Sequence, residues 1–385
     1  MVIYLDNAAT SYPKPPQVAR AMAEYMLQVG APINRSAYGP AQEAAQVTLR
    51  LRERLARFLG FPYKPSHVIL TPGCTAAINQ ILFGYLRPGD HCLVSAMEHN
   101  AVMRPLTYLA QTRGVTFDRI PCDETGLLDP FAIGKLVKPN TRLAVIAHGS
   151  NVSGVIQDAE AIGAILADYG VPFALDAAQT AGETPVDFDR FQLSALAVPG
   201  HKSLMGPAGT GALLVSPDFA RELQPIVLGG TGSEAHSEIQ PAFLPDRFEP
   251  GTPNLPGFYG LDSALSYLEA IGIEAIRAHD QLLCRHFVHE VSFLRGVRLV
   301  GPTNLNQRLG VFSLDFIGRD NDEMGQRLER QFGILTRCGL HCAPNAHKTL
   351  GTYPQGTVRM STSYFTTIEE LDAALEAIDI LSTLK

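Results

Sequence analysis

Between about residues 68 and 216, short apolar runs alternate with longer stretches of helical periodicity. The runs predict strands at Val68–Thr71, Cys92–Ala96, Val115–Ile120, Leu143–Ala147, Pro172–Leu175, Leu193–Val198 and Gly211–Val215. Every position of Leu143–Ala147 is apolar, which is typical of a strand buried on both faces in a parallel sheet. The stretches between the runs predict helices, among them Thr75–Tyr85, Asn100–Thr112 and Ala159–Tyr169. The pattern therefore predicts an α/β fold around a large, mostly parallel seven-stranded sheet.

The regular alternation of predicted strands and helices ends after this region. Residues 228–256 contain glycine- and proline-rich turns and show little periodicity. The sequence beyond them predicts helices at Leu261–Ile271, Gln281–Arg295 and Ile368–Leu381, and strands at Val311–Phe316 and Val358–Ser363. We therefore expect two domains, a large one over residues 16–260 and a smaller α+β one over residues 1–15 and 261–385.

Composition argues against several classes of function. The chain has 385 residues, a formal net charge of -7 and no run of lysine and arginine, so nucleic acid is not an expected partner. Its apolar runs are too short to span a membrane, and its N-terminus lacks the pattern of a signal peptide. The six cysteines have no disulfide-framework spacing, which indicates a cytoplasmic protein with free thiols.

A lysine and an aspartate at two strand ends carry the main chemical hypothesis. Lys202 follows Gly200-His201 just beyond one predicted strand, where backbone can approach a ligand closely. Asp176 follows the predicted strand Pro172–Leu175, at the edge where ligands bind in open α/β sheets. An amine can form a Schiff base with an aldehyde cofactor, and a carboxylate can keep the cofactor's pyridinium nitrogen protonated. The pair indicates pyridoxal 5'-phosphate (PLP); a solvated lysine and a helix-capping aspartate are the alternatives.

Four further polar residues lie at or near the ends of predicted strands. Gln179 is placed to reach the phenolate oxygen of the same ring, and His99 to stack on its face. Thr75 lies in a glycine turn that opens a helix, where free N–H groups and a partial positive charge suit a phosphate. Asn151 follows another strand and is expected in the wall of the site. For the last three, the alternatives are a structural histidine, a turn without a ligand and an ordinary polar turn.

Cys342 and two arginines are candidates for substrate chemistry. Cys342 lies in a polar, loop-like segment, where His341 and Arg337 are expected to lower its pKa toward that of a thiolate. The alternative for Cys342 is a small buried residue. Arg359 stands inside an apolar strand and needs an anionic partner, either a substrate carboxylate or an internal salt bridge. The cysteine and histidine spacing around Cys342 is too irregular for zinc, so no metal is expected.

Together these motifs resemble those of the cysteine desulfurases and their relatives among the class-V aminotransferases. The resemblance covers nearly the whole chain and includes Tyr4–Thr10, Asn34-Arg35-Ser36 and Arg247–Asn254. It implies a PLP-dependent transferase of fold type I, a homodimer whose small domain carries the loop of the nucleophilic cysteine. The implied reaction converts L-cysteine to L-alanine, with sulfur passing to Cys342 as a persulfide and then to a sulfur-acceptor protein.

The resemblance also implies roles for individual residues. It assigns catalysis to Lys202, Cys342 and His99. It assigns cofactor binding to Thr75, Ala76, His99, Asn151, Asp176, Gln179, His201 and Lys202, together with the partner subunit's Thr252. It assigns substrate binding to Asn34, Arg35, Asn151, Arg337 and Arg359.

Two positions depart from the family pattern. Pro199 replaces a hydroxyl residue that binds phosphate in many relatives, and Ser203 is the candidate to supply that contact. Ala76 replaces a commonly acidic residue. The short stretch from Cys342 to Arg359 resembles the Suf-type branch. Alternatives of the same fold are a cysteine or cystine C–S lyase, a selenocysteine lyase and an aminotransferase; a non-catalytic sulfur-pathway scaffold is a more remote one.

Overall fold

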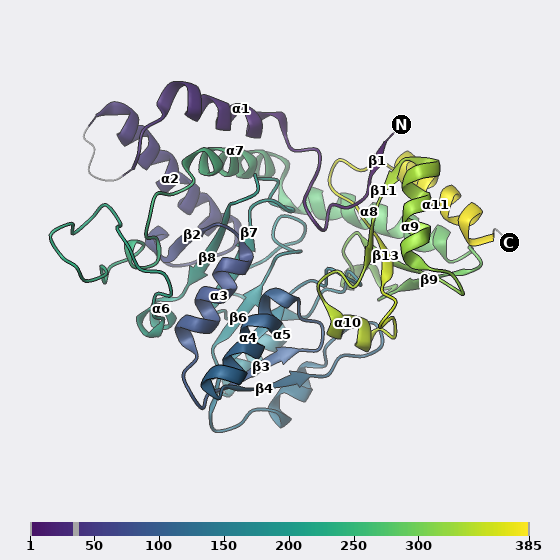
Figure 1. Cartoon of the computed structure of the whole chain (residues 1–385), viewed down its shortest axis with the longest axis horizontal. Helices are drawn as coiled ribbons and strands as arrows, with labels where there is room; N and C mark the ends of the chain where they lie inside the picture. The colour runs from purple at the N-terminus through teal and green to yellow at the C-terminus, as the bar shows by residue number, and fades with distance from the viewer. Residues whose placement is uncertain (1, 34–37, 384–385) are drawn as a thin grey trace.

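A seven-stranded sheet forms the centre of the larger part of the molecule (Figure 1). The computed structural model describes residues 2–33 and 38–383. The strands are β2 (Val68–Thr71), β3 (His91–Ser95), β4 (Thr116–Ile120), β5 (Thr141–Ala147), β6 (Phe173–Asp176), β7 (Ala195–Pro199) and β8 (Gly211–Val215). Their order is β2-β8-β7-β6-β5-β3-β4, with β8 antiparallel to both neighbours and the other pairs parallel. The predicted α/β fold around a mostly parallel sheet is confirmed.

Helices cover both faces of this sheet, which explains the uninterrupted apolar runs. Along β5, Ala144 packs into one core cluster and its neighbour Val145 into the other. The helices of the first cluster are α1 (Pro16–Glu24), α2 (Gly39–Phe58), α5 (Ala159–Asp168) and α7 (Leu255–Ile271). Those of the second are α3 (Cys74–Tyr85), α4 (Asn100–Arg113) and α6 (Pro217–Glu222). Because successive side chains of a strand point to opposite faces, a strand between two helical layers is apolar throughout.

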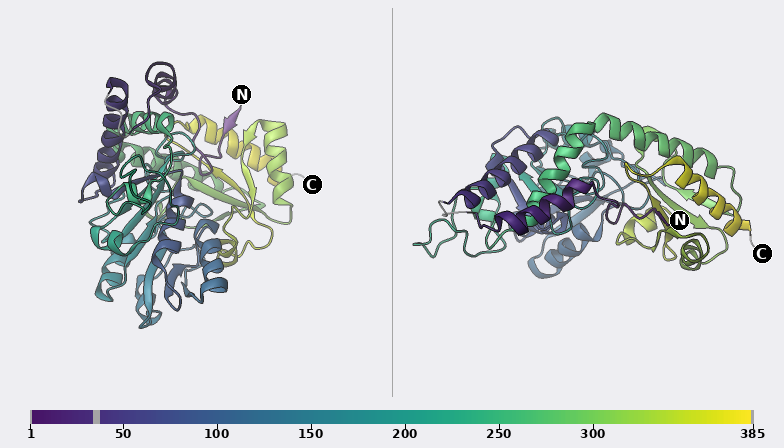
Figure 2. Two further views of the ribbon diagram at one scale, coloured as in Figure 1. Left: turned by 60° about the vertical axis from the view of Figure 1, so that its left-hand side comes forward. Right: turned by 90° about the horizontal axis from the view of Figure 1, so that it is seen from above.

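The remaining elements form a smaller α+β unit beside the sheet (Figure 2). Its antiparallel sheet has the order β12-β13-β10-β9 and is made of β9 (Val297–Val300), β10 (Val311–Phe316), β12 (Arg337–Gly339) and β13 (Thr357–Ser361). A short parallel pair joins β1 (Ile3–Tyr4) to β11 (Ile334–Leu335). The helices are α8 (Ile273–Val291), α9 (Asn321–Phe332), α10 (Pro344–Thr349) and α11 (Ile368–Thr383). Ile3 and Leu5 belong to the core of this unit, so the two ends of the chain pack together.

Several boundaries differ from those predicted. The helix expected from Leu261 begins at Leu255, because Asn254 accepts a hydrogen bond from the N–H of Gly257 (3.1 Å) and caps an earlier start. Helix α8 begins at Ile273 rather than at Gln281. The expected domain boundary between residues 260 and 261 falls inside α7, and it stays a prediction. No helix in the described part of the chain is long and apolar enough to cross a membrane.

Candidate active site

A cavity of about 510 Å³ opens at the carboxyl ends of the parallel strands, where ligands bind in sheets of this type. The predicted residues that line it are Thr75, Ala76, His99, Asn151, Asp176, Gln179, His201 and Lys202. Thr252 lines a neighbouring cavity of about 530 Å³, which shares Pro72, Ala76 and Gly209 with the first. Arg337, Cys342 and Arg359 are not among the lining residues. Asn34 and Arg35 lie outside the described residues.

Asp176 ends β6 and presents a carboxylate at the base of the cavity. Its Oδ1 accepts hydrogen bonds from the N–H of Ala178 (2.9 Å) and from Sγ of Cys74 (3.3 Å). Its Oδ2 accepts no hydrogen bond from the described residues, which leaves that oxygen for a ligand. Burial, and next the charge of Asp176, raise the pKa of Cys74 well above its usual value, so Cys74 stays a neutral donor. Cys74 was missed at the sequence level, although its place after Gly73 at a strand–helix turn was a usable signal.

Lys202 follows β7 in a tight turn that points its amine at the cavity. The turn needs Gly200, because a Cβ there would lie 2.1 Å from Oγ1 of Thr210. The Lys202 amine makes no hydrogen bond or ion pair with any described residue. Burial lowers the pKa of Lys202, while the charge of Asp176 acts in the opposite direction. A partly desolvated amine of lowered pKa is suited to bond with an aldehyde and to exchange protons.

His99 stands at the start of α4 with its ring in the cavity wall. Its Nδ1 accepts a hydrogen bond from the N–H of Ala101 (3.0 Å), so in the neutral ring Nε2 carries the proton. Burial lowers the pKa of His99 and favours that neutral form. One helix turn therefore fixes both the position and the tautomer of this ring.

The start of α3 forms another corner of the cavity. Gly73 has open space where a side chain would stand, and Thr75 and Ala76 follow it in the first turn. The first N–H groups of a helix have no partner inside the helix, and they attract anions. Ser203 lines a separate small cavity with Glu183 and does not reach this corner.

These features fit PLP. Oδ2 of Asp176 and the amine of Lys202, which have no partner among the described residues, face one cavity together with the open start of α3. They match the three polar groups of the cofactor, which are its ring nitrogen, its aldehyde and its phosphate. Among the described residues, no cluster of three or more histidine, cysteine or acidic side chains is arranged to hold a metal ion.

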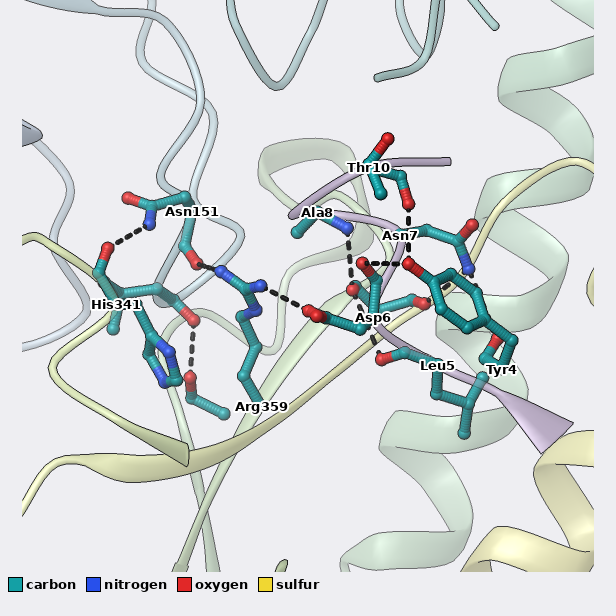
Figure 3. A network of polar contacts seen from close by, with 12 residues as sticks. Tyr4, Leu5, Asp6, Asn7, Ala8, Thr10, Asn151, His341 and Arg359 are labelled. Carbon is teal, nitrogen blue, oxygen red and sulfur yellow. Dashed lines mark hydrogen bonds and ion pairs between the residues drawn. The ribbon is translucent and has the colours of Figure 1, made fainter. Parts of the chain in front are cut away.

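Arg359 lies just behind the cavity wall, in β13. Its Nη2 donates to Oδ1 of Asp6 (2.6 Å) and its Nη1 to the carbonyl of Asn151 (3.1 Å), as Figure 3 shows. Its Nε is buried and has no hydrogen-bond partner among the residues that the structure describes. The internal salt bridge considered as an alternative is therefore present, and it leaves one N–H of the guanidinium without an acceptor in the described part of the chain. Arg337 lies opposite Arg359 on β12, and its exposed guanidinium makes no hydrogen bond or ion pair with the described residues.

Cys342 is exposed and lies on a constrained loop at the edge of the site. His341 and Cys342 have φ angles of 48° and 57°, the left-handed region that residues other than glycine seldom adopt. The carbonyl of Cys342 accepts from the N–H of Asn100 (2.8 Å), and that of His341 from Nδ2 of Asn151 (2.7 Å). Burial lowers the pKa of His341 to about 2, so His341 is neutral and the cations near this loop are Arg359 and Arg337.

Glu98 is fully buried beneath the site and gives a prediction for stability. Its Oε1 accepts hydrogen bonds from Ser95 and from the N–H of Ala147 (2.9 Å), and its Oε2 has no partner in the described part of the chain. Burial raises the pKa of Glu98 to about 8. Between its ordinary pKa of 4.5 and about 8, the folded state holds a proton that the unfolded state has lost. Glu98 thus makes the free energy of unfolding fall as pH rises, by up to about 1.4 kcal/mol per pH unit.

Replacement of Glu98 with glutamine is expected to remove this contribution. Thermal unfolding midpoints measured from pH 5 to 8 should fall more steeply in the wild type than in Glu98→Gln. The exposed Glu124→Gln variant should follow the wild type. Parallel curves for wild type and Glu98→Gln would mean that Glu98 is ionised throughout this range.

Comparison with known proteins agrees with this site. Residues 3–374 match the family described as Aminotransferase class-V. The chain is 35% identical over 382 residues to a probable cysteine desulfurase of Methanothermobacter thermautotrophicus. The alignment covers 98% of this chain and 94% of the relative. The alignment with a cysteine desulfurase of Haloferax volcanii is 29% identical and covers 98% of this chain and 89% of the relative.

Solved structures show the same similarity. The apo structure of a cysteine desulfurase from Thermococcus onnurineus NA1 superposes with a TM-score of 0.93 at 32% identity, over 99% of this chain and 94% of that chain. A cysteine desulfurase from Escherichia coli superposes with a TM-score of 0.89 at 28% identity, over 100% of this chain and 96% of that chain. The chain belongs to the class-V aminotransferases, which are PLP-dependent enzymes of fold type I. Within that family, the proteins it is similar to are cysteine desulfurases, which confirms the predicted resemblance.

Proposed function

We propose that this protein is a PLP-dependent cysteine desulfurase that converts L-cysteine to L-alanine and takes the sulfur onto Cys342. The observation that carries the proposal is the position of Cys342. It is exposed, and two hydrogen bonds tie its loop to the rim of a cavity that fits PLP. A cysteine placed there can meet the sulfur of an amino acid bound in the cavity and still pass sulfur outward.

The cavity residues divide the binding of the cofactor among them. We assign Lys202 to the covalent link, Asp176 to the ring nitrogen, Gln179 to the ring oxygen and His99 to the ring face. We assign the phosphate to Thr75, Ala76 and His201, together with the partner subunit's Thr252. When bound, PLP withdraws electrons from the α-carbon of the substrate and so makes its proton removable. The amine of Lys202, freed when substrate binds, then takes that proton.

The substrate carboxylate is assigned to arginine and asparagine side chains beside the cavity. Within residues 2–33 and 38–383, one buried N–H of Arg359 and the guanidinium of its neighbour Arg337 have no partner. Asn151 lines the cavity between them and the ring. Asn34 and Arg35 keep the substrate role that the resemblance implies. Planar guanidinium groups suit a carboxylate because they can donate two parallel hydrogen bonds.

The sulfur step follows from the chemistry of the Cys342 thiolate. Its Sγ attacks the substrate sulfur, and an S–S bond forms as the C–S bond breaks. The bonding electrons stay on the substrate carbon, which takes up a proton and leaves as part of alanine. Cys342 then carries a persulfide, and a thiol of an acceptor protein removes the outer sulfur.

We further propose a cytoplasmic homodimer of the Suf-type branch. All six cysteines are free thiols, as suits a reducing compartment. Thr252 lies on a second cavity that adjoins the first. A segment of another copy that entered there would reach the phosphate corner.

Product analysis tests the proposed function. The purified protein, supplied with PLP and L-cysteine, should form alanine in amounts equal to the sulfur released in the presence of a thiol acceptor. Formation of pyruvate and ammonia in place of alanine would instead identify a C–S lyase. Alanine from L-selenocysteine but none from L-cysteine would identify a selenocysteine lyase.

A further inference from the structure

A chain of partly buried polar contacts connects the N-terminal segment to the loop of Cys342 (Figure 3). It begins at Asp6, whose carboxylate binds Arg359, and it continues through the carbonyl of Asn151. The side chain of Asn151 then donates to the carbonyl of His341, the residue before Cys342. Each link joins segments that are far apart in the sequence.

The Asp6 end of this chain is fixed by backbone contacts. Residues 5–8 run beside β13, where the N–H of Ser361 donates to the carbonyl of Leu5 (2.7 Å). The N–H of Ala8 donates in turn to Oγ of Ser361 (2.8 Å). The backbone on both sides of Asp6 is therefore anchored to β13, and the short Asp6 side chain leaves its carboxylate little range of movement.

Arg359 transmits this position because it has little freedom of its own. Only 2% of its surface is exposed, so its charge must be compensated within the protein. Asp6 supplies the one carboxylate that bonds to it among the described residues. With that bond in place, Nη1 is directed at the carbonyl of Asn151 (3.1 Å). Without it, the guanidinium would turn toward other acceptors and release Asn151.

The Cys342 loop needs this support because its backbone is unfavourable. Two successive residues, His341 and Cys342, adopt left-handed φ angles, which persist only when surrounding contacts enforce them. The hydrogen bond from Asn151 to the His341 carbonyl (2.7 Å) is one such contact, and that from Asn100 to the Cys342 carbonyl (2.8 Å) is another. If the hydrogen bond from Asn151 weakened, the loop would move and the hydrogen bond from Asn100 would weaken too.

We propose that Asp6 is a positioning residue for Cys342, acting through Arg359 and Asn151. This inference rests on the proposed role of Cys342 as the sulfur acceptor. Asp6 itself touches neither the cavity nor the thiol. Its carboxylate fixes the guanidinium that fixes Asn151, and so it holds Cys342 at the distance that attack on the substrate sulfur needs.

Amide hydrogen exchange tests this role in the full-length, PLP-loaded protein. The N–H of Asn100 donates to the carbonyl of Cys342, and the N–H of Ala343 donates to the carbonyl of Leu340 across the same loop (2.8 Å each). In Asp6→Asn, both amides should exchange at least about tenfold faster, because a charge-assisted hydrogen bond that supports this loop is lost. Asp6→Glu, which keeps the charge, should show a smaller increase. Persulfide formation on Cys342, followed by mass spectrometry, should slow by at least about tenfold in Asp6→Asn.

Asp315→Asn provides the matched control. Asp315 lies on the same sheet and pairs with Arg298 (3.1 Å), but it has no contact with this chain of residues. Unchanged exchange at Asn100 and Ala343 in Asp6→Asn would overturn the proposal. The proposal would also be overturned if Asp315→Asn accelerated exchange at these two amides equally, or if Asp6→Asn raised exchange rates evenly over the whole protein. Asp6 would then only support the fold. Hydrogen exchange can be measured without turnover. A wild type that forms no alanine would therefore refute the proposed function, but the exchange rates would still decide whether Asp6 supports the Cys342 loop.

Discussion

Replacement of Lys202 with alanine is expected to lower turnover of L-cysteine by at least about a thousandfold. The amine is the only unpaired one among the residues that line the cavity, and burial lowers its pKa. Its loss removes both the covalent attachment of the cofactor and the base for the α-proton. Alanine formation under saturating L-cysteine is the measurement.

The same lysine can be identified without any turnover. Borohydride treatment of the wild type should attach PLP to the peptide that contains Lys202, and mass spectrometry should locate it there. Lys135→Ala, a change of an exposed lysine that does not line the cavity, should keep both activity and attachment. If Lys202→Ala retained wild-type activity, or if the label appeared on another lysine, the cofactor assignment made here would be wrong.

The sequence predicted the sheet and the cavity well because both depend on local patterns. Apolar runs such as Leu143–Ala147 mark strands buried on both faces, and polar residues that follow them collect at one edge of a parallel sheet. The positions of Lys202, Asp176 and His99 after three such strands therefore predict that they lie at one edge of the sheet. The direction of β8 could not be predicted, because an antiparallel strand buried between two helical layers has the same composition as a parallel one.

The contacts that the sequence could not predict are those between distant segments. Asp6 and Arg359 are separated by most of the chain, and no local pattern links them. His341 was expected to lower the pKa of Cys342, but neighbouring residues in a left-handed turn need not point the same way. The His341 side chain is buried and bonded to Thr357, whereas that of Cys342 is exposed. Burial decides the charge state of His341, and burial was not visible in the sequence.

Replacement of Cys342 with alanine is expected to lower alanine formation by at least about a hundredfold and to abolish the protein-bound persulfide. L-Cysteine should still bind and change the absorption of the cofactor, because Cys342 does not line the cavity. The variant should therefore bind the substrate but fail to break its C–S bond. Cys338→Ala is the matched control, since Cys338 lies four residues earlier on β12 and is half-buried.

The results for Cys342→Ala distinguish a cysteine that accepts sulfur from one that takes no part in the reaction. If Cys342→Ala binds L-cysteine but forms neither persulfide nor alanine, the thiol is what removes sulfur from the substrate. Continued release of sulfide at the wild-type rate would show that the C–S bond breaks without a protein nucleophile. In that event the cavity and Lys202 would perform the reaction alone, and the enzyme would be a lyase whose exposed cysteine has another use. Because the substitution changes an exposed side chain that belongs to none of the hydrophobic core clusters, a folding defect would not explain either result.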